Sequence, residues 1–333
     1  MRERANVSEL FVSFQGEGLY AAPNPPFGAV FTYYLKEEIK GRKKKRQDQE
    51  KEIAKKGGDV PYPSWEDLKA EDREEDPTIL LTITDQDGQV VRTISGGVTA
   101  GFTRVAWDLR YPPSTPTELK PGEEDIFTEP SRGPLAAPGT YRVSLARRVE
   151  GKVTPLSAPQ TFEAVPLASA GLPAKDREAM LAFQRKVARL QRAVLGAAKS
   201  VDEAQDRIDH LKRALLDTPG ADPGLGVEVR SLEQRLKDLG TALSGDSVKS
   251  KRNEPTPPAI VNRVQQIVDG EWSSTAGSTR THQRNYEIAA SQFTEVLGHL
   301  RALVNSDLKR LEERAEIAGA PWTPGRVPDW KPE

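Results

Sequence analysis

Apolar and polar residues alternate in several short segments within residues 28–168, and a period of two is typical of short β-strands. The strands that this pattern predicts are 29–35, 79–84, 89–94, 102–109, 139–145, 152–154 and 160–165. Asp87-Gly88 is a typical hairpin turn between two of them. The side of strand 102–109 that carries Trp107 is the predicted core face. Short strands at turn-punctuated spacing favour an antiparallel β-sandwich.

A charged segment at 37–76 interrupts the strand pattern, which resumes after Pro77. The segment contains a basic run at 40–46 that mixed charges follow at once. Two interpretations stay open for this insertion: a solvated helical hairpin or a flexible excursion. Because acidic residues dilute the basic run, we prefer a solvated face to a contact with nucleic acid or anionic lipid.

The apolar rhythm changes near Pro173 to one residue in every three or four, which predicts amphipathic helices. The predicted helices cover 180–215, 229–243, 260–268 and 281–317. Joined by turns and by a polar, proline-containing loop predicted at 244–258, they predict an antiparallel bundle of about four helices over 172–317. The predicted fold class is therefore α+β and multidomain, with a sandwich followed by a bundle.

Composition excludes several classes of site and partner. The chain has 333 residues, and 48 Lys and Arg against 49 Asp and Glu leave a formal net charge of -1. This balance gives no reason to expect a nucleic-acid partner. The absence of cysteine excludes disulfides, thiolate metal sites and a cysteine nucleophile. No apolar run approaches the ~18 residues of a membrane span, so we expect no membrane insertion.

Residues 1–27 are interpreted as a linker and a remnant of a preceding domain. No apolar stretch of signal-peptide length follows Met1, so the compartment stays open.

Four segments, taken in order, resemble a known bacterial module. They are Ala29-Val30-Phe31-Thr32-Tyr33-Tyr34-Leu35-Lys36, the Asp-x-x-Gly-x-Val-Val-Arg hairpin within 83–92, Gly101-Phe102-Thr103-Arg104-Val105-Ala106-Trp107-Asp108-Leu109-Arg110 and Pro138-Gly139-Thr140-Tyr141-Arg142-Val143. Their order resembles the immunoglobulin-like module of the flagellar hook-capping type. It is still more similar to the C-terminal region of bacterial proteins that begin with a BNR-repeat, sortilin-like β-propeller and are often labelled glycosyl hydrolases. The segment 318–326 is similar to the end of that family.

The resemblance implies an Ig-like sandwich at 28–168, an exported protein and a β-propeller or another protein as partner. No propeller repeat precedes residue 25, so an activity attributed to the propeller has no counterpart here. We therefore predict a non-catalytic accessory or interaction module of a propeller-containing exported protein. The alternatives are a glycan-acting hydrolase fragment and a carbohydrate-binding module. The oligomeric state stays open.

Residues with catalytic or metal-binding chemistry are sparse. His210, His282 and His299 lack metal-ligand spacing, and we expect them to be ordinary surface or packed histidines. The acidic run 123–125 contains calcium-type ligands, although a solvated loop is the preferred interpretation. A glycosidase needs two carboxylates at a fixed separation, and no such pair stands out. We predict no catalytic residue, no cofactor and no metal site.

Aromatic side chains outside the predicted core are the candidates for a ligand or partner surface: Trp65, Tyr111, Trp322 and Trp330. The last two lie in a Trp- and Pro-rich tail at 318–333. Ordering an extended tail costs conformational entropy, so we expect this tail to pack on the bundle or the sandwich, with a partner as the alternative.

Overall fold

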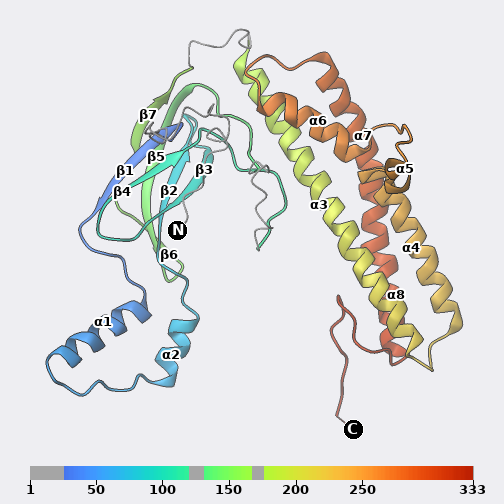
Figure 1. The fold of residues 1–333 in the computed structure, drawn as a ribbon, viewed down its shortest axis with the longest axis horizontal. Helices are drawn as coiled ribbons and strands as arrows, with labels where there is room; N and C mark the ends of the chain where they lie inside the picture. The colour runs from blue at the N-terminus through green and yellow to red at the C-terminus, as the bar shows by residue number, and fades with distance from the viewer. Residues whose placement is uncertain (1–25, 120–130, 167–175, 333) are drawn as a thin grey trace, which may run out of the picture. The chain divides into compact units, whose positions relative to one another are not determined.

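A computed structural model describes residues 26–119, 131–166 and 176–332, and its fold is mixed α+β (Figure 1). The chain divides into two compact units: Met1–Pro112 with Leu135–Ser169, and Pro113–Pro134 with Ala170–Glu333. The first contains the strands and the second the long helices. Among the described residues, no helix is both long and apolar enough to span a bilayer.

All the strands of the first unit pair antiparallel and form two sheets. The smaller sheet joins β1 (Ala29–Leu35) to β4 (Gly101–Trp107). The larger sheet has the order β3-β2-β5-β6, with β7 also paired to β5. Its strands are β2 (Thr78–Thr84), β3 (Val90–Gly96), β5 (Gly139–Val149), β6 (Lys152–Pro155) and β7 (Gln160–Ala164).

Aromatic rings from both sheets meet in the core of this unit. Trp107 of β4 lies edge-on to Tyr141 of β5 and Phe162 of β7, with ring centroids 5.5 and 6.2 Å away. Phe31 of β1 lies 5.3 Å from the same Phe162 ring. The Trp107 indole N–H donates to the carbonyl of Arg110 over 2.9 Å, which satisfies its polar atom. The predicted core face of this strand is confirmed, because Trp107 is buried.

The charged insertion forms two helices, α1 (Arg42–Lys55) and α2 (Trp65–Asp72). The helical interpretation of this segment is thus the one that the structure adopts. None of the residues in either helix is buried. The N-terminus of α1 has no side-chain cap of its own, and the Glu74 carboxylate accepts a hydrogen bond from the Arg42 backbone N–H over 2.5 Å instead.

The second unit packs long helices around one apolar core. Its helical segments are α3 (Arg177–Leu216), α4 (Pro223–Ser244), α5 (Ser247–Lys251), α6 (Ile260–Trp272), α7 (Arg280–Ala302), the π-helical η2 (Leu303–Leu308) and α8 (Lys309–Ile317). Asp176 caps α3 by accepting from the Ala179 N–H, and Asp222 caps α4 just before Pro223. The predicted helix 281–317 corresponds to α7, η2 and α8 together.

Candidate interaction surfaces

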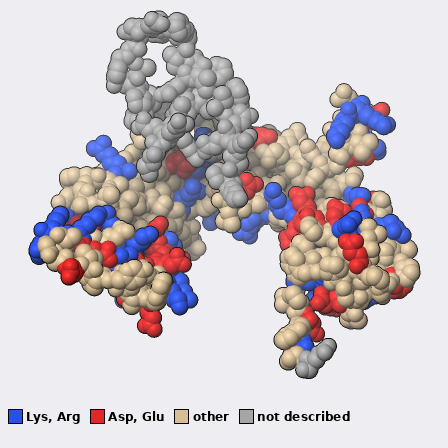
Figure 2. Space-filling model, turned by 60° about the horizontal axis from the view of Figure 1, so that its bottom comes forward, with Lys and Arg blue, Asp and Glu red and all other residues tan. Residues whose placement is uncertain are grey.

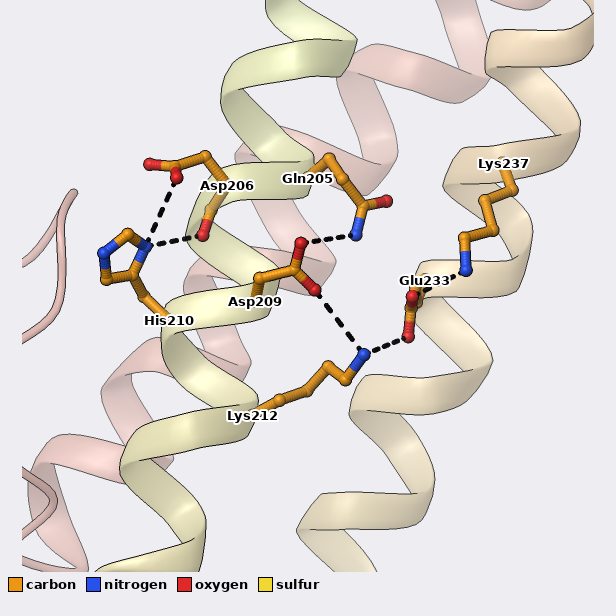
Figure 3. A network of polar contacts seen from close by, with 7 residues as sticks. All are labelled: Gln205, Asp206, Asp209, His210, Lys212, Glu233 and Lys237. Carbon is orange, nitrogen blue, oxygen red and sulfur yellow. Dashed lines mark hydrogen bonds and ion pairs between the residues drawn. The ribbon is translucent and has the colours of Figure 1, made fainter. Parts of the chain in front are cut away.

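A group of polar contacts connects α3 to α4 in the helical unit (Figure 3). Lys212 Nζ lies 2.8 Å from Glu233 Oε2, and Lys237 Nζ lies 2.7 Å from Glu233 Oε1. Hydrogen bonds from Lys212 and Lys237 lower the pKa of the Glu233 carboxyl to about 2. His210 Nδ1 lies 2.8 Å from the main-chain oxygen of Asp206. A carboxyl with so low a pKa is a weak base and is ionised near neutral pH, so the Lys212–Glu233 contact serves to pair α3 with α4.

A buried carboxylate, Glu271 of α6, lies between a serine and a histidine. Its Oε1 is 2.8 Å from His282 Nδ1, and its Oε2 accepts from Ser278 Oγ over 2.9 Å. Its main-chain oxygen also accepts from the buried Gln184 amide over 3.0 Å. In a catalytic triad the histidine contacts the serine hydroxyl, and here the carboxylate separates the two. The contacts hold α6 to the start of α7 and do not activate a nucleophile.

The other candidates for metal or acid–base chemistry remain separate. In the three described ranges, no group of three or more His, Asp and Glu side chains is placed to hold a metal ion. His210 and His299 are exposed on helix surfaces. The acidic run 123–125 lies outside the described residues. Among the described residues, these side chains make pairing and packing contacts within the helical unit.

The C-terminal tail packs on α8 through a buried guanidinium. Arg326 Nη1 donates to Glu316 Oε2 over 2.7 Å, and its Nε donates to Thr323 Oγ1 over 3.0 Å. The remaining nitrogen, Nη2, donates to the carbonyls of Ala320 and Pro321. One side chain thus closes the turn of the tail and pairs with the helix before it.

The two tail tryptophans lie outside this anchor. Trp322 is 60% exposed and Trp330 is 79% exposed. The Trp322 indole N–H donates to the carbonyl of Arg326 over 2.8 Å, which fixes the ring relative to the turn. Gly325 has a φ of +89°, and an added Cβ would lie 2.6 Å from the Arg207 side chain. The tail packs as expected, although the contact is made by Arg326 and not by the indole rings.

Trp65 and Tyr111 differ in exposure. Trp65 begins α2, is 71% exposed, and its ring lies 6.3 Å from that of Tyr62, which is 77% exposed. Tyr111 is half-buried and packs against the cluster that contains Trp107, so its ring contributes to the core. Trp65 and Tyr111 belong to the strand unit, whereas both tail tryptophans belong to the helical unit.

An exposed aromatic pair on the small sheet was not among the predicted surface residues. Tyr34 of β1 and Phe102 of β4 are directly opposite in the register, and their ring centroids are 5.0 Å apart. Tyr34 is 59% exposed and Phe102 is 81% exposed. Val30 on β1 and Arg104 on β4 are also exposed. Each lies an even number of residues along its strand from Tyr34 or Phe102, so all four side chains share one face of the sheet. The alternation that buries Trp107 directs Phe102 outward, so the signal for this face was present in the sequence.

No family model, curated protein or solved structure matches this chain in the comparisons with known proteins.

Proposed function

We propose that this chain is a non-catalytic interaction module, an Ig-like β-sandwich followed by an antiparallel four-helix bundle, which is accessory to a β-propeller domain of an exported protein. Two packed antiparallel sheets and helices around one core support this architecture. The resemblance of the strand motifs to the C-terminal region of propeller-containing proteins supports the choice of partner.

The outward face of the small sheet carries the proposal. Tyr34, Phe102 and Val30 expose apolar side chains on adjacent strands. Exposed apolar side chains that are gathered on one face mark sites of association, and aromatic residues supply much of the affinity at protein interfaces. Arg104 is opposite Thr32, midway between Val30 and Tyr34 along β1, and adds a guanidinium suited to a carboxylate on the partner.

Binding to a purified BNR-repeat β-propeller, measured by isothermal titration calorimetry, tests this proposal. Phe102→Ala should weaken binding by about thirtyfold or more, because central aromatic side chains contribute roughly 2 kcal/mol or more. Val90→Ala removes an exposed apolar side chain from β3 and is the matched control, which should bind like the wild type. Equal binding by all three proteins would exclude this face. Hydrolysis of a glycan by the purified chain, abolished by one carboxylate substitution, would contradict a non-catalytic role.

Carbohydrate binding is the second candidate, because the two rings of the Tyr62–Trp65 pair are exposed side by side. The two rings are inclined at 65° to each other, so the exposed face of the Trp65 indole is the surface on which a sugar ring would stack. A glycan array read with the wild type and with Trp65→Ala distinguishes this function. Binding that is lost with Trp65 would favour it, and an array without signal would discard it.

A further inference from the structure

The strands at the sheet edges differ in whether their residues block further pairing. Five of the seven strands, β1, β3, β4, β6 and β7, lie at an edge. Charged side chains or proline on an edge strand hinder the addition of another strand. Such residues are Arg92 in β3, Arg104 in β4, Glu163 in β7, and Lys152 and Pro155 in β6. β1 has no charged residue and no proline, so it is the edge best suited to accept a strand.

The outer edge of β1 is open. Among the described residues, β1 pairs only with β4, and its residues make no further main-chain hydrogen bond. The charged side chains of this unit gather elsewhere: Figure 2 shows Lys and Arg beside Asp and Glu at the end where α1 and α2 lie. In an antiparallel pair, alternate residues direct their N–H and C=O groups away from the partner strand. These groups of β1 therefore face a position that a third strand can fill.

Apolar side chains beside this edge are incompletely covered. Tyr33 and Leu35 in the second half of β1 are buried, whereas Phe31 in the first half is only half-buried. Phe162 of β7 is also half-buried, and its ring centroid lies 5.3 Å from that of Phe31. A strand that placed apolar side chains on the inner side of the sheet would remove both rings from water, and burial of apolar area is favourable.

A short segment ahead of β1 has the sequence of such a strand. Leu10-Phe11-Val12-Ser13-Phe14 contains aromatic and β-branched residues, no charge and no proline. Leu10, Val12 and Phe14 alternate with the other two residues, so a strand here would have three apolar side chains on one side. The segment itself lies outside the described residues.

We propose that residues 10–14 pair antiparallel with the free edge of β1 as the third strand of the small sheet. In the register of this pairing, Val12 lies opposite Phe31, and its side chain packs inward over the Phe31 and Phe162 rings. Ser13 lies opposite Val30 and faces outward. Residues 15–28 connect the two strands, and closing a connection of this length costs little conformational entropy.

The chain's own segment fits this edge better than a second copy does. β4 follows β3 at one side of the large sheet, and β7 lies at the other side, so the free edge of β1 is on the side of β7. Pairing between the β1 strands of two copies would bring the large sheets of both into this space. A single strand brings no second sheet, and its covalent connection to β1 gives it a high effective concentration.

Hydrogen exchange of the full chain, resolved to single residues, tests the proposal. In the wild type, the β1 amides that do not bond to β4 should be protected. Val12→Asp places a carboxylate on the inner side and should speed their exchange by at least about tenfold, because the apolar burial that holds the strand is lost. Ser13→Asp changes the neighbouring, outward residue and is the matched control, which should exchange like the wild type.

An introduced disulfide provides a second measurement of the same register. The chain has no cysteine of its own, so Ser13→Cys with Val30→Cys can form only this one bond, and it should form on mild oxidation. Val90 is exposed on β3 of the other sheet, and Ser13→Cys with Val90→Cys should stay reduced.

Three results would overturn the proposal. They are rapid exchange of these β1 amides in the wild type, exchange in Val12→Asp equal to the wild type, and a disulfide that forms with Val90 as readily as with Val30. The first would leave the edge open to a strand from another protein. No measurement involves a propeller or Phe102, so this proposal and the proposed function fail separately.

Discussion

Arg326 is the residue on which the conformation of the tail depends. Its guanidinium bonds to Glu316, to Thr323 and to two main-chain carbonyls, and it is buried. Arg326→Ala leaves the Thr323 hydroxyl and two main-chain carbonyls without these donors, and an unsatisfied buried polar group costs about 1–3 kcal/mol. We expect the tail to detach and chymotrypsin to cleave faster at Trp322.

Arg326→Lys is the informative comparison for this anchor. A lysine keeps the charge near Glu316 but lacks the planar set of donors that reaches Thr323 and the carbonyls together. Cleavage should be intermediate between wild type and Arg326→Ala. Cleavage of Arg326→Ala at the wild-type rate would show that the guanidinium does not hold the tail.

Glu233 provides a pH-dependent prediction for the pairing of α3 with α4. Hydrogen bonds from Lys212 and Lys237 lower its pKa from 4.5 to about 2. A lowered carboxyl pKa stabilises the folded state above pH 4.5, and this contribution is lost as the pH falls toward 2. Glu233→Gln should therefore reduce the free energy of unfolding at pH 7 by about 1 kcal/mol, since solvent screens a surface pair.

Urea unfolding at several pH values measures this contribution. The difference between wild type and Glu233→Gln should shrink steadily below pH 4.5. Glu313→Gln, at an exposed position of α8, is the control and should show no such trend. A difference that is constant with pH would mean that the two lysines do not hold the carboxylate.

Alternation along a strand made some of these residues predictable and left others hidden. Trp107 and Phe102 lie on opposite sides of one strand, so the pattern that buries the first exposes the second. The burial of Arg326 could not be predicted in this way, because the Pro-rich tail has no regular pattern of apolar residues. Its burial depends on Glu316, a partner that the sequence alone does not place beside it.

At the scale of elements, an ion pair and not a buried apolar core joins α1 to α2 in the insertion. Arg46 pairs with Glu71 and also with Glu50, and its pKa is raised by these hydrogen bonds. Arg46→Gln removes both pairs, so we expect faster amide hydrogen exchange across α1 and α2. High salt should have the same effect on the wild type, because exposed ion pairs are screened.

Exchange in the sheets should stay unchanged in Arg46→Gln, since their cores contain no residue of the insertion helices. Lys56→Gln, just beyond the end of α1, is a charge-matched control and should exchange like the wild type. Protection of α1 that survives both high salt and Arg46→Gln would point to stabilisation by other contacts.

Long helices were predictable because their apolar stripes persist over many turns, as in α3 and α4. Shorter features were not. The π-helical η2 lies inside an unbroken periodic pattern, and α5 has only five residues in a stretch predicted as a loop. Asp246 caps α5 by accepting from two backbone N–H groups, so a local cap formed a helix too short for periodicity to reveal.

At the scale of the whole molecule, the two units have separate apolar cores. The buried clusters of the strand unit contain only residues of that unit, and the cluster around Ile208 and Leu236 contains only residues of the helical unit. Each buried apolar cluster among the described residues thus belongs to one unit alone. Each unit should therefore lose its structure in its own transition.

Trp107→Ala tests this separation. Removing a buried indole that contacts Tyr141 and Phe162 should destabilise the strand unit by about 3–5 kcal/mol. Hydrogen exchange during heating, followed by mass spectrometry, should show β2 and β5 opening at a lower temperature while α3 and α4 open as in the wild type. Leu236→Ala should give the reverse result, since its side chain is fully buried among the helices. If either substitution lowered the opening temperature of both units equally, the units would share stability through contacts outside their cores, and separate unfolding would be wrong.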